Sequence, residues 1–368
     1  MKILQILPEL NSGGVERGTL EIAAHLVREG HEALVVSNGG RQVSALEKLG
    51  ARHMAMPVHR KSLATFLQVK PLRRLFREER PDIVHIRSRV PGWIAWLAWR
   101  GLPKNARPHL VSTVHGFYSV NAYSAVMTRG ERVIAVSESV RDYILKNYPS
   151  VPEKHVRVIH RGVAPEEFPR GYHPSAEWLE QWRKEQPQLA GKKTLLLPGR
   201  ITRWKGQEDL LALVATLKAR RLPVHGLIAG ETHPKKREFA EELKQLAVRL
   251  GVEADVTFLG HRNDIRDVMA ISDVVLSLSR DPEAFGRVSL EAAALGRPVA
   301  GYDHGGVAEQ LRVLFPQGLV PVGDATILAL TCTRMLEEGG EPSPVTEPFT
   351  REAMCGATLG IYRELNGA

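Results

Sequence analysis

Cysteine is scarce in this chain, which contains only Cys332 and Cys355 among its 368 residues. Two cysteines without metal-ligand spacing exclude a disulfide framework, so a reducing compartment is expected. Long apolar runs are missing too, because no stretch approaches the ~18 residues that a membrane-spanning helix needs. The first eight residues are too short for a signal peptide, since Pro8 and Glu9 interrupt them. These absences predict a cytoplasmic location.

Several motifs of catalytic and binding proteins are also absent. No Asp-x-Asp pair suited to a divalent metal and a diphosphate occurs, and no Cys/His cluster indicates zinc. No Ser–His–Asp order indicates a hydrolase triad. The glycine-rich loops have neither the P-loop spacing nor the G-x-G-x-x-G spacing of a dinucleotide site. We therefore expect no metal and no bound cofactor.

The composition is that of a globular protein with one strongly basic half. Hydrophobic residues make up 43% of the chain and charged residues 25%, and 368 residues are enough for two domains. Residues 1–168 contain 25 Lys and Arg against 15 Asp and Glu, whereas residues 169–368 contain 25 against 26. The net charge of +9 therefore belongs to the first half, which is expected to face an anionic partner.

Apolar, β-branched runs alternate with helical patterns along the chain, as in α/β proteins. We expect strands near residues 2–7, 33–36, 53–57, 82–86, 110–115, 132–136, 156–159, 193–198, 224–229, 255–259, 273–277, 298–300 and 319–321. We expect helices near residues 16–29, 63–78, 92–100, 120–128, 138–147, 207–219, 235–250, 265–270, 287–295, 307–312, 325–337 and 350–364.

This alternation predicts two doubly wound, Rossmann-like domains with parallel sheets. The boundary is expected within residues 164–191, where Pro, Gly, Glu and Trp replace the alternation. The domains are therefore assigned to residues 1–168 and 169–349. Two such domains facing each other would form a cleft at the carboxyl ends of their strands, where sheets of this class bind ligands.

The most informative segment is residues 283–291. Glu283 and Glu291 flank Phe285 and Gly286 at the start of an expected helix. Glycine before a helix lets its unpaired N–H groups approach a ligand at the positive end of the helix dipole, which suits phosphate. The two carboxylates would accept from hydroxyls on either side of that phosphate, as a nucleotide sugar offers. Taken alone, the segment equally fits an amphipathic helix with two solvated Glu residues.

Basic residues occupy the loop that follows the first expected strand of the second half. Arg200 can fork across two phosphate oxygens, while Lys205 acts as a compact point charge. Such a pair is what neutralising a departing diphosphate requires. The alternative is a solvated basic loop, which is the role expected for Arg203.

Weaker signals follow other expected strands. Gly14 allows close backbone approach to a ligand, and a simple tight turn is its alternative. His115 at a strand end can hydrogen-bond a substrate or shuttle a proton, whereas His85 is expected to be structural. Gly230 and Arg262 each follow a strand of the second half and are expected to form the floor under a nucleobase, although turn glycines explain this signal nearly as well.

Together these residues resemble the retaining glycosyltransferase family 4, which has the GT-B fold. The resemblance covers nearly the whole chain and rests on an ordered set: Gly13-Gly14, His115-Gly116, Gly199-Arg200 to Lys205-Gly206, Gly230, Glu283-x7-Glu291 and Gly305-Gly306. Ala284 replaces the Pro that often follows the first acid in this family. Arg287, at the helix start, contacts phosphate or faces solvent, and the sequence leaves this open.

The resemblance implies a nucleotide-sugar donor on the C-terminal domain and an acceptor on the N-terminal domain, with residues 350–368 packing back on the latter. It implies that Arg200 and Lys205 bind the diphosphate, Glu291 the ribose and Glu283 the donor sugar, with phosphate contacts from Phe285 and Gly286. Gly14, Gly230 and Arg262 would complete the donor site, and His115 would lie near the reacting carbon. A UDP-sugar is favoured, with GDP- and ADP-sugars open, and metal-independent hexosyl transfer by front-face attack is expected.

The basic first half favours an acceptor that carries phosphates or lies in an anionic membrane, such as lipopolysaccharide core or another lipid-linked glycan. Residues 60–77 have apolar and basic faces, and Trp93, Trp96 and Trp99 recur every three residues. Both features are typical of peripheral contact, here with the inner face of the cytoplasmic membrane. A core-facing helix explains them equally well.

Two other functions stay open at the level of sequence. A sugar-nucleotide epimerase on the same fold would need no acceptor, so incubation with the donor alone distinguishes it from a transferase. A nucleic-acid-binding protein would fit the basic charge. However, no basic-aromatic recognition motif is present, and nucleic acid is not expected as a partner.

Overall fold

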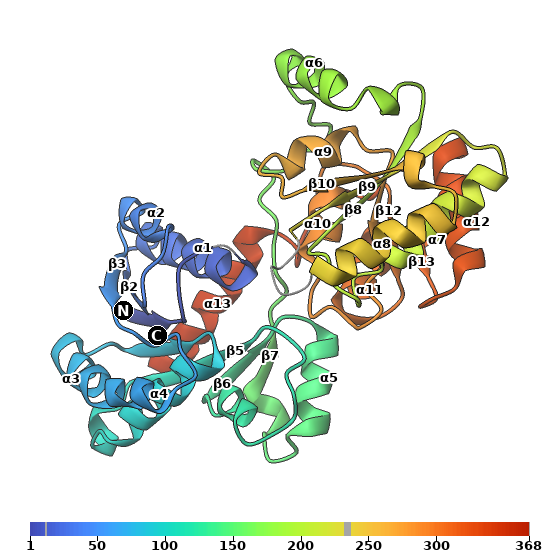
Figure 1. The fold of residues 1–368 in the computed structure, drawn as a ribbon. Coiled ribbons are helices and arrows are strands. Elements are labelled where there is room, and N and C mark those ends of the chain that lie inside the picture. The colour runs from blue at the N-terminus through green and yellow to red at the C-terminus, as the bar shows by residue number, and fades with distance from the viewer. Residues whose placement is uncertain (12, 232–236, 368) are drawn as a thin grey trace. The chain divides into compact units, whose positions relative to one another are not determined.

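The computed structural model describes residues 1–11, 13–231 and 237–367. The chain forms two compact units, each built on its own parallel sheet (Figure 1). Unit 1 comprises Met1–Gly162 together with Arg351–Ala368, and unit 2 comprises Val163–Thr350. Unit 1 is therefore discontinuous in sequence, because the C-terminal helix returns to the sheet that the N-terminus begins.

Unit 1 contains a seven-stranded sheet in the order β3-β2-β1-β4-β5-β6-β7. Its strands are β1 Lys2–Ile6, β2 Glu32–Ser37, β3 Arg52–Ala55, β4 Ile83–Ile86, β5 His109–Val114, β6 Arg132–Ala135 and β7 Val156–Val158. The order reverses at β1, where Ile3 pairs with Ala33 of β2 and with Ile83 of β4. Since crossovers between parallel strands are right-handed, this reversal places helices on both faces of the sheet.

The helices of unit 1 include one contributed by the end of the chain. They are α1 Gly14–Arg28, α2 Val43–Lys48, α3 Val69–Glu79, α4 Arg89–Arg100, α5 Glu138–Asn147 and α13 Arg351–Asn366, with 3₁₀ helices η1 Leu63–Gln68, η2 Lys104–Ala106, η3 Ser124–Thr128 and η4 Glu153–His155. Met354, Leu359 and Tyr362 of α13 are buried in the same core as Ile3 and Ile22. The C-terminal helix is therefore part of the hydrophobic core of unit 1.

His85 fastens α13 to the sheet. Its Nδ1 lies 2.5 Å from the Tyr362 hydroxyl and its Nε2 lies 2.6 Å from Thr113 Oγ1. His85 is fully buried, and this burial, with the nearby Arg87 and Arg161 cations, holds the pKa of the imidazole well below its ordinary value. A buried, neutral ring with both nitrogens bonded is a structural histidine, as expected from the sequence.

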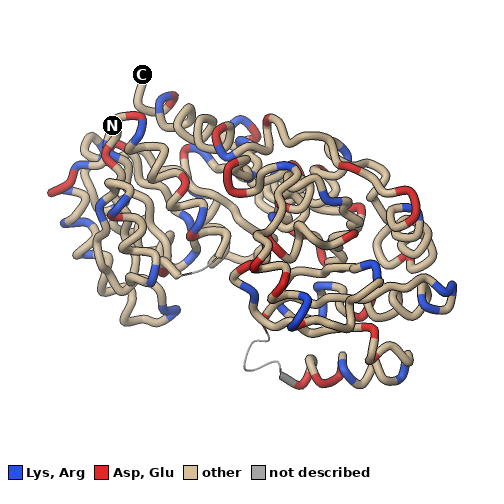
Figure 2. The backbone as a smooth tube through the Cα atoms, turned by 90° about the horizontal axis from the view of Figure 1, so that it is seen from above, with Lys and Arg blue, Asp and Glu red and all other residues tan. Residues whose placement is uncertain are grey.

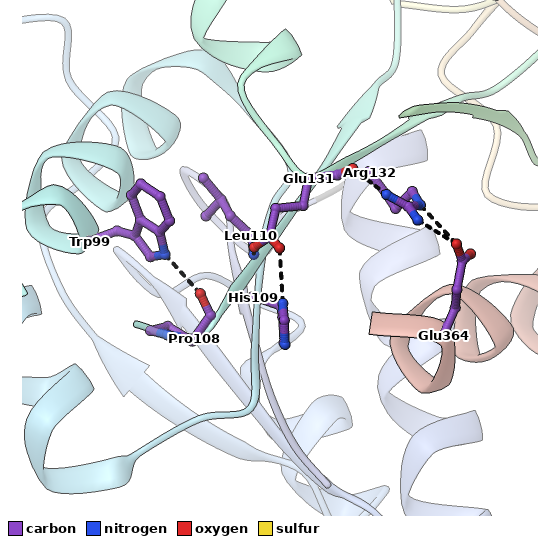
Figure 3. Close-up of polar contacts among 7 residues, drawn as sticks. All are labelled: Trp99, Pro108, His109, Leu110, Glu131, Arg132 and Glu364. Atoms are coloured by element: carbon purple, nitrogen blue, oxygen red, sulfur yellow. Dashed lines mark hydrogen bonds and ion pairs between the residues drawn. The ribbon is translucent and has the colours of Figure 1, made fainter. Parts of the chain in front are cut away.

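Polar contacts also fasten the amino end of the unit 1 sheet (Figure 3). Glu131 accepts hydrogen bonds from His109 Nδ1 and from the Leu110 N–H, each at 3.0 Å. The Trp99 indole N–H donates to the Pro108 carbonyl at 2.7 Å, and Arg132 Nε donates to Glu364 of α13 at 3.1 Å. His109 and Trp99 are thus held by contacts within the unit, at the edge opposite to the carboxyl ends of the strands.

Unit 2 contains a six-stranded sheet in the order β10-β9-β8-β11-β12-β13. Its strands are β8 Lys193–Pro198, β9 Val224–Ala229, β10 Val256–Gly260, β11 Val274–Ser277, β12 Val299–Tyr302 and β13 Leu319–Val320. Its helices are α6 Ala176–Glu185, α7 Gln207–Ala219, α8 Arg237–Arg249, α9 Ile265–Ile271, α10 Arg287–Ala294, α11 Gly305–Leu314 and α12 Ala325–Glu338, with 3₁₀ helices η5 Pro187–Leu189, η7 Glu253–Asp255 and η8 Pro316–Gly318. The order reverses at β8, which pairs with both β9 and β11.

The predicted fold class, two doubly wound parallel-sheet domains, is confirmed. Two α-helices of the described residues were not predicted: α2, and α6 within the expected boundary segment. Residues 63–78 were predicted as one helix, but a 3₁₀ turn occupies 63–68, and the helix predicted near 120–128 is a 3₁₀ helix over 124–128. Residues 235–236 of the helix predicted at 235–250 lie outside the described residues.

Candidate active site

Two loops meet at the carboxyl edge of the unit 2 sheet, at the point where the strand order reverses. Open α/β sheets bind ligands in the crevice at such a point. The loop after β8 carries Arg200 and Lys205, and the loop after β11 carries Glu283. The topology therefore brings residues predicted from distant parts of the sequence to one edge of one sheet.

Lys205 and Glu283 form an ion pair at this edge. Lys205 Nζ lies 2.7 Å from Glu283 Oε1, and Ser279 Oγ donates to the same oxygen at 2.5 Å. The two charged side chains are 16% and 19% exposed, so the pair is largely removed from solvent. Gly206 permits the close approach, because its φ is 76° and a Cβ there would stand 2.1 Å from the Leu278 carbonyl oxygen.

The two arginines of the β8 loop differ in their surroundings. Arg203 Nη2 forms an ion pair with Glu242 at 2.7 Å, consistent with its expected surface role. Arg200 is exposed, and within the described part of the chain its guanidinium makes no hydrogen bond or ion pair. Its carbonyl accepts from Gln207 Nε2 at 3.1 Å, which fixes the backbone of the loop. Arg200 therefore offers a cation beside the Lys205–Glu283 pair that is not committed elsewhere.

Helix α10 begins directly after Gly286, as the sequence predicts. Gly286 has a φ of 84° and precedes the helix, and a Cβ there would stand 2.4 Å from Val307 Cγ2. Glu291 lies one turn inside the helix and is only 9% exposed. Its carboxylate lies 3.5 Å from Arg287 Nε, so Arg287 contributes an ion pair to the helix start.

The glycine pair at the start of α11 supports the Glu283 loop from behind. Gly306 N–H donates to the Glu283 carbonyl at 2.8 Å, and a Cβ on Gly306 would stand 2.5 Å from Phe285 Cα. His304 Nε2 donates to the Ser279 carbonyl at 2.7 Å. These contacts fix the backbone that carries the carboxylate and the start of α10.

A cavity lies beside the neighbouring strands of unit 2. It has a volume of about 420 Å³, and its lining includes Ile201, Gly230, Phe258 and His261. Gly230 is required by the packing of the loops, since a Cβ there would stand 1.9 Å from the Gly199 carbonyl oxygen. The predicted floor for a nucleobase therefore coincides with a space large enough for one aromatic ring system.

Arg262 is not among the residues that line this cavity. Its guanidinium bonds Asp264 through two nitrogens, at 2.8 and 2.5 Å, and lies 3.6 Å from Glu185. Asp264 is the main cause that raises the pKa of Arg262. The group also lies over the Trp182 ring of α6, at 5.4 Å. The structure therefore directs Arg262 toward α6 and away from the other residues predicted for the site.

His115 follows β5 in unit 1 and is held by Arg161. Its Nδ1 lies 2.5 Å from Arg161 Nη2, and because a guanidinium only donates, Nδ1 is the acceptor. The ring proton is then on Nε2, which has no hydrogen-bond partner among the described residues. Burial, together with the Arg161 and Arg87 cations, holds the pKa of His115 well below its ordinary value. His115 is therefore a neutral ring with an available N–H donor.

Sequence reasoning missed two arginines in the surroundings of His115. Arg87 directly follows β4 and Arg161 follows β7, and the two are 1% and 7% exposed. Their position at strand ends was the available signal, but nothing in the residue pattern indicates that a guanidinium is buried. Gly14 begins α1 after β1 and is exposed, while Ser12 of the same loop lies outside the described residues.

Two further observations concern metals and membranes. Among residues 1–11, 13–231 and 237–367, no three His, Cys, Asp or Glu side chains are grouped so that they could hold a metal ion. None of the helices in this described part combines the length and apolar character that crossing a bilayer requires.

Family models match both units of the chain. Residues 12–167 match "Glycosyltransferase Family 4", and residues 180–347 match "Glycosyl transferases group 1". A D-inositol 3-phosphate glycosyltransferase of Saccharomonospora viridis is 29% identical over 318 residues, which cover 78% of this chain and 71% of that protein.

Solved structures match the chain over almost its whole length. A glycosyltransferase of Rickettsia africae is 28% identical, with a TM-score of 0.83 over 99% of this chain and 98% of that one. The Anabaena protein HepE in complex with UDP-glucose is 22% identical, with a TM-score of 0.75 over 100% of this chain and 97% of that one. At this lower identity, the likeness to HepE establishes the fold alone.

Proposed function

The chain belongs to glycosyltransferase family 4 and uses a nucleotide-sugar donor, and from this premise we propose that it is a retaining, metal-independent hexosyltransferase. The proposed donor is a UDP-sugar, and the proposed acceptor is a phosphorylated or lipid-linked glycan such as lipopolysaccharide core. The observation that carries the proposal is the Lys205–Glu283 pair beside the start of α10. The roles of the individual residues follow from that arrangement.

The proposed diphosphate site combines two cations with the start of α10. Arg200 has an uncommitted guanidinium and Lys205 a partly desolvated ammonium, both on the β8 loop. Backbone N–H groups after Gly286 lie at the positive end of the helix and favour an anion there. In the structure Glu283 shares the Lys205 ammonium. When a diphosphate binds, Lys205 can also contact it, and Glu283 remains in place to accept from sugar hydroxyls.

The proposed nucleoside site lies on the same edge. Glu291 would accept from the ribose hydroxyls, and the cavity lined by Gly230, Phe258 and His261 would hold the base. The cavity of about 420 Å³ has room for a pyrimidine or a purine. UDP is favoured because HepE, which shares the fold, is known in complex with UDP-glucose. GDP and ADP are the alternatives that a binding screen would distinguish.

Replacing Glu291 by Ala is expected to weaken UDP binding at least about tenfold, because hydrogen bonds to a charged acceptor contribute about 1.5–3 kcal/mol. Replacing Glu283 by Ala should leave UDP affinity largely intact but impair sugar transfer. Calorimetric titration of UDP into both variants tests this assignment. An equal loss of UDP affinity in the two variants would show that their roles are wrongly assigned.

The reaction proposed is substitution at the anomeric carbon with retention. The bond between C1 and the leaving phosphate oxygen breaks, and the acceptor oxygen bonds to C1 from the same face. The acceptor's proton passes to the departing phosphate oxygen, whose charge Lys205 and Arg200 stabilise. His115 would donate its Nε2–H to a substrate hydroxyl. Gly14, at the carboxyl end of β1, would allow close approach of the backbone to substrate.

An anionic acceptor is supported by the charge of the first half of the chain, where basic segments recur (Figure 2). The S. viridis relative is named for D-inositol 3-phosphate, a phosphorylated polyol. A surface with net positive charge raises the local concentration of such acceptors and speeds their association. A phosphorylated acceptor and one embedded in an anionic membrane share this requirement.

Peripheral membrane contact is proposed through η1 and its basic neighbours. Leu63 and Leu67 of η1 are 89% and 74% exposed, beside an apolar pocket of about 350 Å³ that Phe66, Trp93 and Tyr123 help to line. The apolar face of α3 does not contribute, because its Leu72, Leu75 and Phe76 are buried in the core. The structure therefore moves the proposed apolar contact from α3 to η1.

The tryptophan series and Arg73 are also engaged within unit 1. The Trp93 indole N–H donates to the Tyr123 carbonyl at 2.8 Å, and Arg129 lies 3.9 Å from the Trp96 ring. Arg73 donates to the Ala98 carbonyl at 3.3 Å. Arg74 and Arg77 remain exposed, and Arg74 Nε forms an ion pair with Glu78 at 2.6 Å on the helix surface. The indole groups of Trp93 and Trp96 are therefore engaged within unit 1, and the exposed arginines are the better candidates for contact with lipid headgroups.

The protein is expected to sediment with anionic vesicles at low salt and to dissociate as salt rises, since each basic residue near such a surface contributes about 1 kcal/mol at most. Replacing both Leu63 and Leu67 by Ser, or both Arg74 and Arg77 by Gln, should reduce sedimentation. Replacing Val313, a 57% exposed apolar residue of unit 2, by Ser is the matched control. If the wild type ignores anionic vesicles even at low salt, the membrane proposal fails and a freely diffusing phosphorylated acceptor is favoured.

A further inference from the structure

Arg87 is a fully buried cation whose guanidinium group makes few hydrogen bonds. It directly follows β4 and is 1% exposed. Its Nη1 donates to Gln5 Oε1 at 3.3 Å, whereas Nε and Nη2 have no hydrogen-bond partner among the described residues. No carboxylate in that part of the chain forms an ion pair with it. A buried charge that is neither paired nor fully hydrogen-bonded is costly, so this arrangement calls for a reason.

A second arginine approaches the same point. Arg161 Nη1 and Arg87 Nη2 each lie 3.0 Å from the position that a Cβ on Gly18 would occupy. Gly18 is in the interior of the 15-residue helix α1, where glycine costs about 1 kcal/mol of helix stability relative to alanine. The missing side chain makes room for the two guanidinium groups. Because each nitrogen is 3.0 Å from that point, the two lie no more than 6.0 Å apart, a span that the oxygens of one phosphate can bridge. Arg161 Nη1 also donates to Met354 Sδ at 3.5 Å.

The arginine cluster lies where unit 1 is expected to bind its substrate. The strand order of unit 1 reverses between β1 and β4, and Arg87 N–H donates to the Ile6 carbonyl of β1 at 3.0 Å. Ligands of open α/β sheets bind at the carboxyl ends of the strands at such a reversal. Arg161 Nη2 also contacts His115, whose Nε2–H is available. A neutral donor for a hydroxyl thus adjoins two cations suited to an oxyanion.

A purely structural role explains this cluster poorly. Gln5, the one hydrogen-bond acceptor of Arg87 among the described residues, is itself bonded to the Thr19 carbonyl at 3.1 Å. An apolar side chain at position 87 would fill the same space without burying a charge. Burial lowers the pKa of Arg87 to about 10, so the guanidinium is still charged at neutral pH. The positive charge is therefore retained although the fold itself makes little use of it.

We propose that Arg87 and Arg161 form the receptor for a phosphate group of the acceptor, with His115 Nε2–H directed at a nearby acceptor hydroxyl. This proposal rests on the proposed transferase function and narrows the acceptor to a phosphorylated sugar or polyol with a hydroxyl close to its phosphate. Paired guanidinium groups bind phosphate in a forked geometry. The cations proposed for the donor diphosphate, Arg200 and Lys205, belong to unit 2 and are separate residues.

Inorganic phosphate is the probe for this site. Titrated into the full chain at constant ionic strength, it is expected to bind with one equivalent and to raise the melting temperature. Arg87→Gln should weaken phosphate binding at least about tenfold, because charge-assisted hydrogen bonds are lost. Arg80→Gln is the matched control. Arg80 lies in another basic pocket of unit 1, with Arg107 and His109, and this variant should bind phosphate as the wild type does.

A stability measurement separates a binding role from a structural one. In phosphate-free buffer, Arg87→Gln should melt at the wild-type temperature or above it, because a buried charge that forms no ion pair among the described residues has been removed. A lower melting temperature would make Arg87 a structural residue and overturn the proposal. Should Arg87→Gln fail to fold, Gly18→Ala is the second variant. Its Cβ would stand 3.0 Å from a nitrogen of each guanidinium group, so both must shift, and this is expected to weaken phosphate binding.

Titrations with UDP show whether the arginine cluster binds the phosphate of the acceptor or that of the donor. They also distinguish failure of this proposal from failure of the proposed transferase function. Saturating UDP should leave phosphate binding intact, and Arg87→Gln should bind UDP as the wild type does. Competition between UDP and phosphate would assign the cluster to the donor and overturn the acceptor proposal. Absence of phosphate binding in the wild type, or its loss in Arg80→Gln alone, would also overturn it. Absence of UDP binding in the wild type would instead contradict the proposed function.

Discussion

Replacing Lys205 by Ala is expected to lower turnover about 100-fold, because removing one preorganised stabiliser of a developing negative charge costs about 3 kcal/mol. Arg200→Ala should have an effect of the same order. Steady-state kinetics in excess chelator measure this loss. The same measurements test metal independence, because the wild type should remain active in excess chelator. In a separate assay without chelator, added divalent ions should not restore the activity of Lys205→Ala. Arg203→Ala, on the same loop but paired with Glu242, is the control and should be nearly unaffected.

Because Lys205 forms an ion pair with Glu283, a loss of activity in Lys205→Ala has a second possible cause, which a further variant must test. Lys205→Ala leaves the Glu283 carboxylate, which is 19% exposed, without its cation. The double variant Lys205→Ala/Glu283→Gln removes that unpaired charge. If Lys205 only neutralised Glu283, the double variant would be more active than Lys205→Ala. We expect no recovery, because the double variant lacks both the ammonium proposed for the diphosphate and the carboxylate proposed for the sugar hydroxyls. Near-normal transfer by Lys205→Ala would sink the diphosphate assignment.

Replacing His115 by Ala is also expected to lower kcat/KM about 100-fold, because a donor held in place for the substrate is lost. The neutral ring makes a further prediction about pH. Burial and the Arg161 and Arg87 cations hold the pKa of His115 well below its ordinary value, so the ring stays neutral on both sides of pH 6.5. The pH profile of kcat/KM should therefore contain no ionisation of His115. Near pH 6.5, the wild type and His115→Ala should have profiles of the same shape.

The control for His115 lies on the same strand. His109 begins β5 at the opposite edge of the sheet, where it bonds Glu131 (Figure 3). His109→Ala should retain most of the wild-type kcat/KM. Equal loss in the two variants would indicate damage to β5 rather than loss of a substrate contact. If the kcat/KM of the wild type changes with pH near 6.5 and that of His115→Ala does not, His115 is instead a titrating acid or base.

The fold could be predicted because its elements are strongly patterned. Residues 193–198 and 207–219 were predicted with the bounds of β8 and α7, since a run of branched residues and a long apolar periodicity leave little choice. Helix α6 was missed because Pro and Gly surround it. A signal was present in Ser175, whose hydroxyl accepts from Trp178 N–H at 3.2 Å as an N-cap, and in the i, i+4 pair of Trp178 and Trp182.

The candidate site was only partly accessible from sequence. Glu283 and Lys205 were each predicted from local motifs, but their ion pair joins residues 78 positions apart and depends on strand order. Arg262 looked suitable because it follows a strand, yet Asp264, two residues later, occupies it. The burial of Arg87 could not be predicted, because the sequence around an arginine does not show whether its side chain is buried. The residue types in local motifs indicated which groups could bind phosphate or hydroxyls. Their burial and the direction of their side chains became known only from the packed structure.

The discontinuity of unit 1 has a consequence for synthesis of the chain on the ribosome. Val163 N–H donates to the Phe349 carbonyl at 3.0 Å and Val163 pairs with Thr350, so the two ends of unit 2 lie together, as in a domain inserted into a host's loop. The seven strands of unit 1 are translated before unit 2, whereas the 16-residue helix that completes their core is translated after it. The nascent first half must wait with apolar surface exposed. The inserted half, although it is made later, is the part able to finish folding first.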